Sequence, residues 1–153
     1  MASEQNGKAV VVGTIGQDAH MIGAWVLSEA FKEAGFSVTY LGAVVPQEEF
    51  IDAAIETAAD AILVSSSYGM GIIDCEGLRD KCIEAGLDDI ILYAGGSVAA
   101  LADLESNWPA IERRFIEMGF NRVFRNTVTA EEAIATLKED LGCRIPLDVG
   151  EGA

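Results

Sequence analysis

The chain has 153 residues, 50% of them hydrophobic, which predicts one compact domain with a sizeable buried core. Its 25 acidic residues outnumber 10 basic ones, and the formal net charge of −15 argues against nucleic acid and anionic membranes as partners. No apolar run approaches a membrane span, and the N-terminal segment MASEQNGK lacks a signal-peptide pattern, so we expect a cytoplasmic protein.

The first half of the chain predicts three strands separated by two helices. A strand over residues 8–14 precedes a helix whose apolar residues, from Val26 to Ala34, recur at three- and four-residue spacing. A strand over residues 37–42 precedes a helix that starts after Pro46, a residue suited to the first helical turn. The third strand, over residues 61–66, is nearly continuously apolar, as is typical of parallel strands covered on both faces.

The second half continues the alternation. A helix is predicted over residues 75–85, a strand over 89–96, a helix over 109–118 and a strand over 121–124. The last helix is expected to begin after Thr129, because Thr129 and Glu132 have the spacing of a capping box, and to end near Gly142.

Three similar tetrapeptides stand where predicted helices end: EAGF (33–36), EAGL (84–87) and EMGF (117–120). Glycine favours the left-handed turn that ends a helix, and the Phe or Leu after it can fold back on the last turn. Five βα units of this kind predict an α/β fold, namely a flavodoxin-like, doubly wound, five-stranded parallel sheet with helices on both faces. We expect a single domain over residues 8–142, with tails at 1–7 and 143–153.

The three cysteines, Cys75, Cys82 and Cys143, match neither a disulfide framework nor a zinc site in number and spacing. Cys75 and Cys82 are two helical turns apart, so we expect them to share a buried face as reduced thiols. The acidity also suits a cytoplasm with concentrated salt, which screens repulsion between carboxylates. This hypothesis predicts that folding weakens when salt is removed, and a stability that is indifferent to salt would contradict it.

Three unusual segments follow predicted strands: GTIGQDAHMIG (13–23), SSSYGMG (65–71) and GGSVAA (95–100). Doubly wound folds bind ligands outside the carboxyl ends of their strands, so these segments predict a ligand site. The glycine spacing fits neither a dinucleotide fingerprint nor a P-loop, and no G-x-S-x-G elbow supports a hydrolase. Serines stand where a receiver domain would have an aspartate, at the end of the third strand.

The only histidine of the chain, His20, lies two residues after Asp18 in the first of these segments. A carboxylate at this spacing can hydrogen-bond one ring nitrogen and make the other a better metal ligand. One histidine cannot hold zinc alone, but it suffices for a metal that already has four equatorial ligands in a macrocycle. The residues by themselves equally allow a solvated or helix-capping histidine.

The motif D-x-H-x-x-G, formed by Asp18, His20 and Gly23, resembles the signature of the cobalamin-binding domains of adenosylcobalamin mutases and methionine synthase. Serines after the third strand and paired glycines after the fourth follow in the order of that family. Over residues 10–141, the chain is most similar to the small (sigma) subunits of glutamate mutase, also called methylaspartate mutase. The stretches that carry this closer match are residues 34–87, which include SYGMGIIDCEGLRDKC (67–82), and ILYAGG (91–96).

The resemblance implies that His20 replaces the cofactor's dimethylbenzimidazole base as the lower axial ligand of cobalt, with Asp18 as its hydrogen-bonding partner. The displaced nucleotide tail would enter a deep pocket between the sheet and a helix. The cofactor-binding residues so implied are Gln17, Asp18, Ala19, His20, Met21, Gly23, Ser65, Ser66, Ser67, Gly95, Gly96 and Ser97. The family usually has leucine at the position of Ser67, so a hydroxyl here replaces an apolar wall contact.

The implied function is that of the cobalamin-binding subunit of glutamate mutase, an isomerase that converts L-glutamate reversibly to L-threo-3-methylaspartate. Adenosylcobalamin is the expected cofactor, and it carries the radical chemistry. The large (epsilon) subunit, which holds the glutamate site, is the expected partner in a heterotetramer, and no catalytic residue is expected in this chain. The alternatives are a corrinoid methyl carrier, the small subunit of another acyl-CoA mutase, and a flavodoxin-like module without cobalamin.

Overall fold

The protein is described by a computed structural model that covers residues 8–16, 22–66, 69–98, 107–125 and 127–144. All of its strands run parallel in one sheet: β1 (Ala9–Thr14), β2 (Ser37–Tyr40), β3 (Ala61–Ser66), β4 (Ile91–Gly96) and β5 (Arg122–Phe124). Their order is β2-β1-β3-β4-β5, so the direction of winding reverses between β1 and β3. This is the flavodoxin-like order, and the predicted fold class is confirmed.

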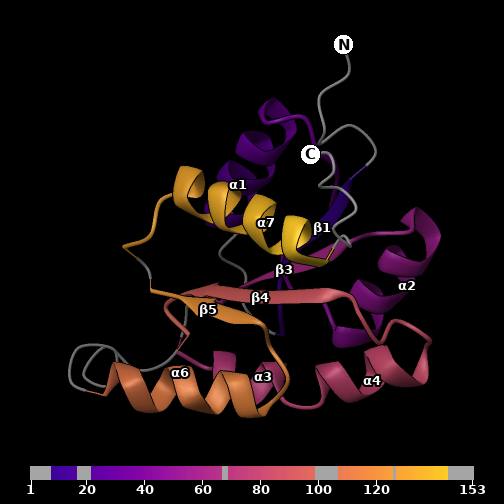
Figure 1. Ribbon diagram of the computed structural model, residues 1–153. Coiled ribbons are helices and arrows are strands. Elements are labelled where there is room, and N and C mark those ends of the chain that lie inside the picture. The colour runs from indigo at the N-terminus through magenta and orange to yellow at the C-terminus, as the bar shows by residue number, and fades with distance from the viewer. Residues whose placement is uncertain (1–7, 17–21, 67–68, 99–106, 126, 145–153) are drawn as a thin grey trace.

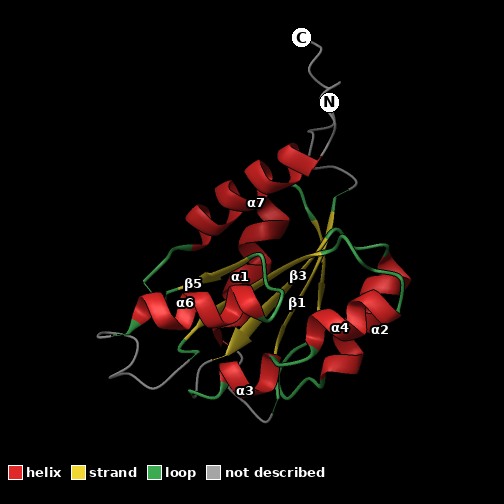
Figure 2. Cartoon of the chain, turned by 60° about the horizontal axis from the view of Figure 1, so that its bottom comes forward, coloured by secondary structure: helices red, strands yellow, loops and turns green. Residues whose placement is uncertain are grey.

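Helices cover both faces of the sheet (Figure 1). One face carries α1 (Ile22–Glu33) and α7 (Ala130–Arg144), which lie side by side. The other face carries α2 (Gln47–Thr57), α3 (Gly71–Cys75), α4 (Leu78–Glu84) and α6 (Trp108–Glu117). Figure 2 shows α3, α4 and α6 in front of the strands, on the side away from α7.

Alternating side chains of the central strands separate two hydrophobic cores. On β3, Leu63 belongs to the core beneath α1 and α7, together with Phe31 and Leu137. Its neighbour Ile62 belongs to the core on the opposite face, together with Phe50. Because successive residues of a strand point to opposite faces, a strand covered on both sides must be apolar throughout, as the sequence of β3 is.

The three predicted helix stops are confirmed. The glycines adopt left-handed φ angles of +100° at Gly35, +85° at Gly86 and +98° at Gly119. After the first of them, the Phe36 N–H donates to the carbonyl of Phe31 at 3.1 Å, and the two rings meet edge to face at 5.1 Å. The backbone bond closes the helix while the ring contact buries apolar surface, so both parts of the predicted stop are present.

The helix expected over residues 75–85 is interrupted, and this part of the prediction is wrong. Gly77, with a φ of +89°, separates α3 from α4. The side-chain amide of Gln47 donates to the carbonyls of Asp74 and Glu76 at 2.7 and 2.9 Å. A partner 27 residues away from Asp74 therefore satisfies carbonyls at the end of α3, which the local apolar pattern does not reveal.

The expectation for two of the cysteines is confirmed despite this interruption. Cys75 and Cys82 are free thiols buried in the same core. Burial raises the pKa of both thiols, and the nearby Asp74 carboxylate raises the pKa of Cys75 further. These two cysteines are therefore packing residues.

The start of α7 is a capping box, as predicted. The Thr129 N–H donates to Oε1 of Glu132 at 3.0 Å, and the Glu132 N–H donates to Oγ1 of Thr129 at 3.1 Å. The helix continues to Arg144 rather than ending near Gly142. In the described ranges, no helix has the length and apolar character needed to cross a membrane.

Candidate functional site

A cavity of about 400 Å³ opens at the carboxyl ends of β3 and β4, between the sheet and the helices α1 and α7. Residues 63–65 of β3 and residues 93–96 of β4, among them Ser65 and Tyr93, form its floor. Val26 and Leu27 of α1 form one wall, and Ala133 of α7 belongs to the other. The volume is within the usual range of ligand sites, and the location is where doubly wound folds bind ligands.

Four of the predicted cofactor-binding residues meet in this cavity. Gly23 comes from the first turn of α1, Ser65 from the end of β3, and Gly95 and Gly96 from the end of β4. The register of the sheet pairs Ser65 with Gly95, so segments 30 residues apart come into contact. The convergence expected from the ends of the strands is therefore present for these four residues.

Other residues of the predicted set do not line the cavity. Ser66 is fully buried at the end of β3, and its Oγ has no hydrogen-bond partner within the described ranges. Ser97 follows β4, and its carbonyl accepts a hydrogen bond from the Gly69 N–H at 3.0 Å. Six further residues of the set lie outside the described residues: Gln17, Asp18, Ala19, His20, Met21 and Ser67.

The glycines of the cavity serve different purposes. Gly96 has a φ of +94°, and a Cβ added there would lie 2.3 Å from the carbonyl oxygen of Ser66, so the backbone itself requires glycine. A Cβ added at Gly95 would make an ordinary 3.8 Å contact with the Cβ of Phe124. A Cβ at Gly23 would have no atom within 4 Å. Gly23 therefore faces open space at the edge of the cavity.

The described residues before position 17 are anchored at the same edge of the sheet. The Ile15 N–H donates to the carbonyl of Ser65 at 3.1 Å, and the Gly16 N–H donates to the carbonyl of Val45 at 2.9 Å. On the other side of the gap, α1 starts at Ile22, one residue before Gly23. The segment that carries the motif Asp-x-His therefore departs from and returns to the carboxyl edge that holds the cavity.

Sequence reasoning missed the contribution of β5 and the segment after it. Phe124, Arg125, Val128 and Thr129 line the cavity, but none of them was in the predicted set. The available signal was the position of these residues at the end of the fifth strand and just after it, since all strands of a parallel sheet end at one edge. Among the described residues that line the cavity, Arg125 is the one that carries a charge, and its guanidinium lies 5.0 Å from the ring centroid of Trp108.

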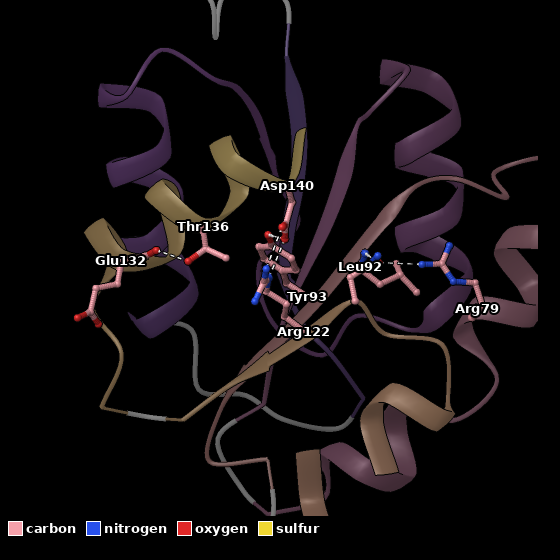
Figure 3. Close-up of polar contacts among 8 residues, drawn as sticks. Arg79, Leu92, Tyr93, Arg122, Glu132, Thr136 and Asp140 are labelled. Carbon is pink, nitrogen blue, oxygen red and sulfur yellow. Dashed lines mark hydrogen bonds and ion pairs between the residues drawn. The ribbon is translucent and has the colours of Figure 1, made fainter. Parts of the chain in front are cut away.

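A polar network joins Tyr93, a residue that lines the cavity, to Asp140 of α7 (Figure 3). The Tyr93 hydroxyl donates to Oδ2 of Asp140 on α7. The Arg122 guanidinium donates to both oxygens of the same carboxylate, through Nε at 2.8 Å and Nη2 at 3.0 Å. The hydrogen bonds from Arg122 lower the pKa of Asp140, and burial raises the pKa of Tyr93. Tyr93 is therefore a neutral donor to a carboxylate that is ionised at neutral pH.

Comparisons with known proteins identify the family. The model of the B12 binding domain matches residues 8–113. The glutamate mutase sigma subunit of Clostridium tetani is 51% identical, over 90% of this chain and 98% of that protein. The sigma subunit of Carboxydothermus hydrogenoformans is 53% identical, over 87% of this chain and 95% of that protein.

Solved structures at lower identity share the fold. A cobalamin-binding protein from Desulfitobacterium hafniense superposes with a TM-score of 0.69 at 20% identity, over 86% of this chain. The monomethylamine corrinoid protein of Methanosarcina barkeri superposes with a TM-score of 0.62 at 21% identity, over 87% of this chain. This chain spans 58% of the length of each. The B12 binding domain covers more than half of the chain, and the two sigma subunits are about half identical to it over nearly its full length. The chain therefore belongs to the family of glutamate mutase sigma subunits.

Proposed function

We propose that this chain is the cobalamin-binding subunit of a glutamate mutase and that its cofactor is adenosylcobalamin. The observation that carries the proposal is the cavity at the carboxyl edge of the sheet, where Gly23, Ser65, Gly95 and Gly96 come together. The chain that forms this cavity belongs to the family of glutamate mutase sigma subunits. The family also favours this function over a corrinoid methyl carrier, the small subunit of another mutase or a module without cobalamin. When bound, adenosylcobalamin supplies the adenosyl radical that starts the carbon-skeleton rearrangement.

The residues of the cavity fit the nucleotide tail of cobalamin. The walls are mainly apolar and include small side chains such as Ala130 and Ala133, which leaves room for a flat heteroaromatic base. The Ser65 hydroxyl can donate to a benzimidazole nitrogen. Arg125 adds one positive charge to the lining, which suits the phosphodiester of the tail in a chain that is otherwise strongly acidic.

We propose that His20 would hold the cobalt of the bound cofactor and that Asp18 would be the hydrogen-bonding partner of His20. Support comes from the motif and from the described residues Ile15 and Gly23, which place both ends of the segment at the edge of the cavity. The chain's part in the reaction is to bind the corrinoid, fix its orientation and shield it from water. The large (epsilon) subunit, which would hold the glutamate site, is the proposed partner in a heterotetramer.

The test is the electron paramagnetic resonance spectrum of cob(II)alamin bound to nitrogen-15-labelled chain, in complex with the unlabelled large subunit. Splitting by a spin-one-half nitrogen identifies an imidazole of this chain as the axial ligand, and His20 is its only histidine. The His20→Ala variant is the matched control and should lose this splitting. Splitting by the spin-one nitrogen of the cofactor's own base would overturn the ligand assignment.

A further inference from the structure

Tyr93 lines the cavity and also contacts α7. Its buried side chain packs edge to face on Phe124, another lining residue, with ring centroids 5.1 Å apart and an interplanar angle of 75°. The hydroxyl donates to Asp140, 47 residues later in the chain. One side chain therefore links the floor of the cavity to the helix that forms a wall.

The acceptor of this hydrogen bond is itself held in place. Arg122 binds both oxygens of the Asp140 carboxylate, and two parallel bonds from a planar guanidinium fix the plane of the carboxylate. The preceding residue fixes β5, because the side-chain oxygen of Asn121 accepts from the Leu92 N–H at 2.8 Å and from Nη2 of Arg79 at 3.0 Å (Figure 3). The network thus connects α7 to β4 and β5 in a defined geometry.

Water has partial access to the pair of Arg122 and Asp140. The Arg122 side chain is 47% exposed and that of Asp140 21% exposed, so solvent screens part of their attraction. What the network specifies is the placement of α7 on the sheet.

The placement of α7 matters because the half of the helix that faces the cavity has small side chains. Ala130 and Ala133 line the cavity, whereas Leu137 and Leu141 are buried in the core beneath the other half. Asp140 stands two helical turns, about 10 Å, beyond Ala133. A tilt or rotation of α7 at this anchor would therefore move the wall that Ala133 forms.

We propose that Tyr93, through Asp140, positions α7 as the wall of the cavity that receives the nucleotide tail of the cofactor. The inference rests on the proposed function and adds a positioning residue to it. It predicts that the network affects the binding of the tail and not the binding of the corrin ring. Cobinamide, a corrinoid without the nucleotide tail, makes this distinction measurable.

The experiment compares equilibrium binding of cob(II)alamin and of cobinamide to the complex of this chain with its large subunit. Tyr93→Phe keeps the ring and removes the hydroxyl. We expect cob(II)alamin to bind about tenfold more weakly, because binding of the tail must then fix a wall that the hydrogen bond to the charged Asp140 no longer holds. Cobinamide binding should not change. Asp140→Ala removes the acceptor from a partly exposed position and should reproduce the pattern if Tyr93→Phe does not fold.

Thr136→Val is the matched control, because it removes a hydroxyl from the same helix whose acceptor, the Glu132 carbonyl, lies within α7, and Thr136 does not line the cavity. Both corrinoids should bind this variant as they bind the natural chain. At saturation the nitrogen-15 splitting of bound cob(II)alamin should persist in Tyr93→Phe, since α7 does not carry the axial ligand.

Equal losses for both corrinoids, or no loss for either, in the Tyr93 and Asp140 variants would overturn the inference. The inference would also be overturned if the natural complex bound cob(II)alamin no more tightly than cobinamide, because the nucleotide tail would then contribute nothing to the affinity. A natural complex that binds neither corrinoid would instead refute the proposed function. The two failures are therefore distinguishable.

Discussion

Replacing Gly23 by alanine is expected to change the stability of the fold and the affinity for the cofactor in opposite directions. Gly23 is exposed in the first turn of α1, and a Cβ there would meet no atom within 4 Å. Alanine is the better helix former, by up to about 1 kcal/mol, and it also restricts the unfolded chain. We therefore expect Gly23→Ala to raise the free energy of unfolding by about 0.5–1 kcal/mol.

The same methyl group would reduce the space available to the cofactor. Gly23 lines the cavity, so its Cβ would occupy room proposed for the nucleotide tail. Overpacking of a well-filled site costs about 1–3 kcal/mol, which corresponds to a roughly 5–150-fold loss of affinity. Stability and affinity are thus expected to change in opposite directions.

The assay pairs urea unfolding, followed by far-UV circular dichroism, with cob(II)alamin titration of the complex with the large subunit. Gly142→Ala is the matched control, because Gly142 lies in α7, also has no atom within 4 Å of a built Cβ, and does not line the cavity. It should raise stability without changing affinity. An unchanged affinity in Gly23→Ala would refute the placement of the tail beside α1, and a loss of stability would refute the described start of the helix.

Three further predictions concern backbone strain, acid and thiol reactivity. Gly96→Ala should lower the free energy of unfolding by at least about 2 kcal/mol in urea, because a left-handed residue with a Cβ costs about 1–2 kcal/mol and the Cβ would also meet the Ser66 carbonyl. Asp140, whose pKa is lowered, should contribute stability above about pH 4 that is lost on further acidification, so Asp140→Asn should flatten the acid-unfolding curve. Cys75, whose pKa is raised by burial, should resist alkylation at pH 8 until urea unfolds the chain, as followed by peptide mass spectrometry.

Each of these predictions has a control. Gly95→Ala is matched to Gly96→Ala, since its Cβ makes only an ordinary contact, and equal losses in the two would contradict the role given to the backbone. Arg122→Gln should flatten the acid curve in the same sense as Asp140→Asn, because Arg122 is the largest cause of the lowered pKa. Rapid alkylation of Cys75 in the folded chain would contradict its burial.

Local chemistry was sufficient to predict all five strands, most of the helices and several of their ends. The continuous apolar run of β3, the glycine at each helix stop and the spacing of Thr129 and Glu132 are all short-range features, and each is confirmed. The alternation of strands and helices then implied the parallel sheet, because a parallel connection needs a crossover helix. The edge of the sheet that holds the cavity also followed from this alternation.

Distant contacts decided what local patterns left open. Gln47 caps α3 from another helix, so the predicted helix over residues 75–85 is divided. The cavity wall formed by α7 depends on which helix covers which strands, and no pattern in the sequence of α7 indicates a ligand. The hydrogen bond from Tyr93 to Asp140 joins a residue of an apolar strand to a residue on the charged surface of a helix. Neither local sequence indicates that the two residues are partners.

The sequence by itself determined the fold class, the helix stops and the strand-end segments that meet at the cavity, because these depend on periodicity, backbone preference and the common edge of parallel strands. Within those segments, the family resemblance selected Gly23, Ser65, Gly95 and Gly96. Only the tertiary structure decided that Ser65 lines the cavity while Ser66 does not, and that Arg125 and Tyr93 belong to it. The physical reason is that a cavity is bounded by elements brought together by packing, and packing partners are not encoded at any fixed sequence distance.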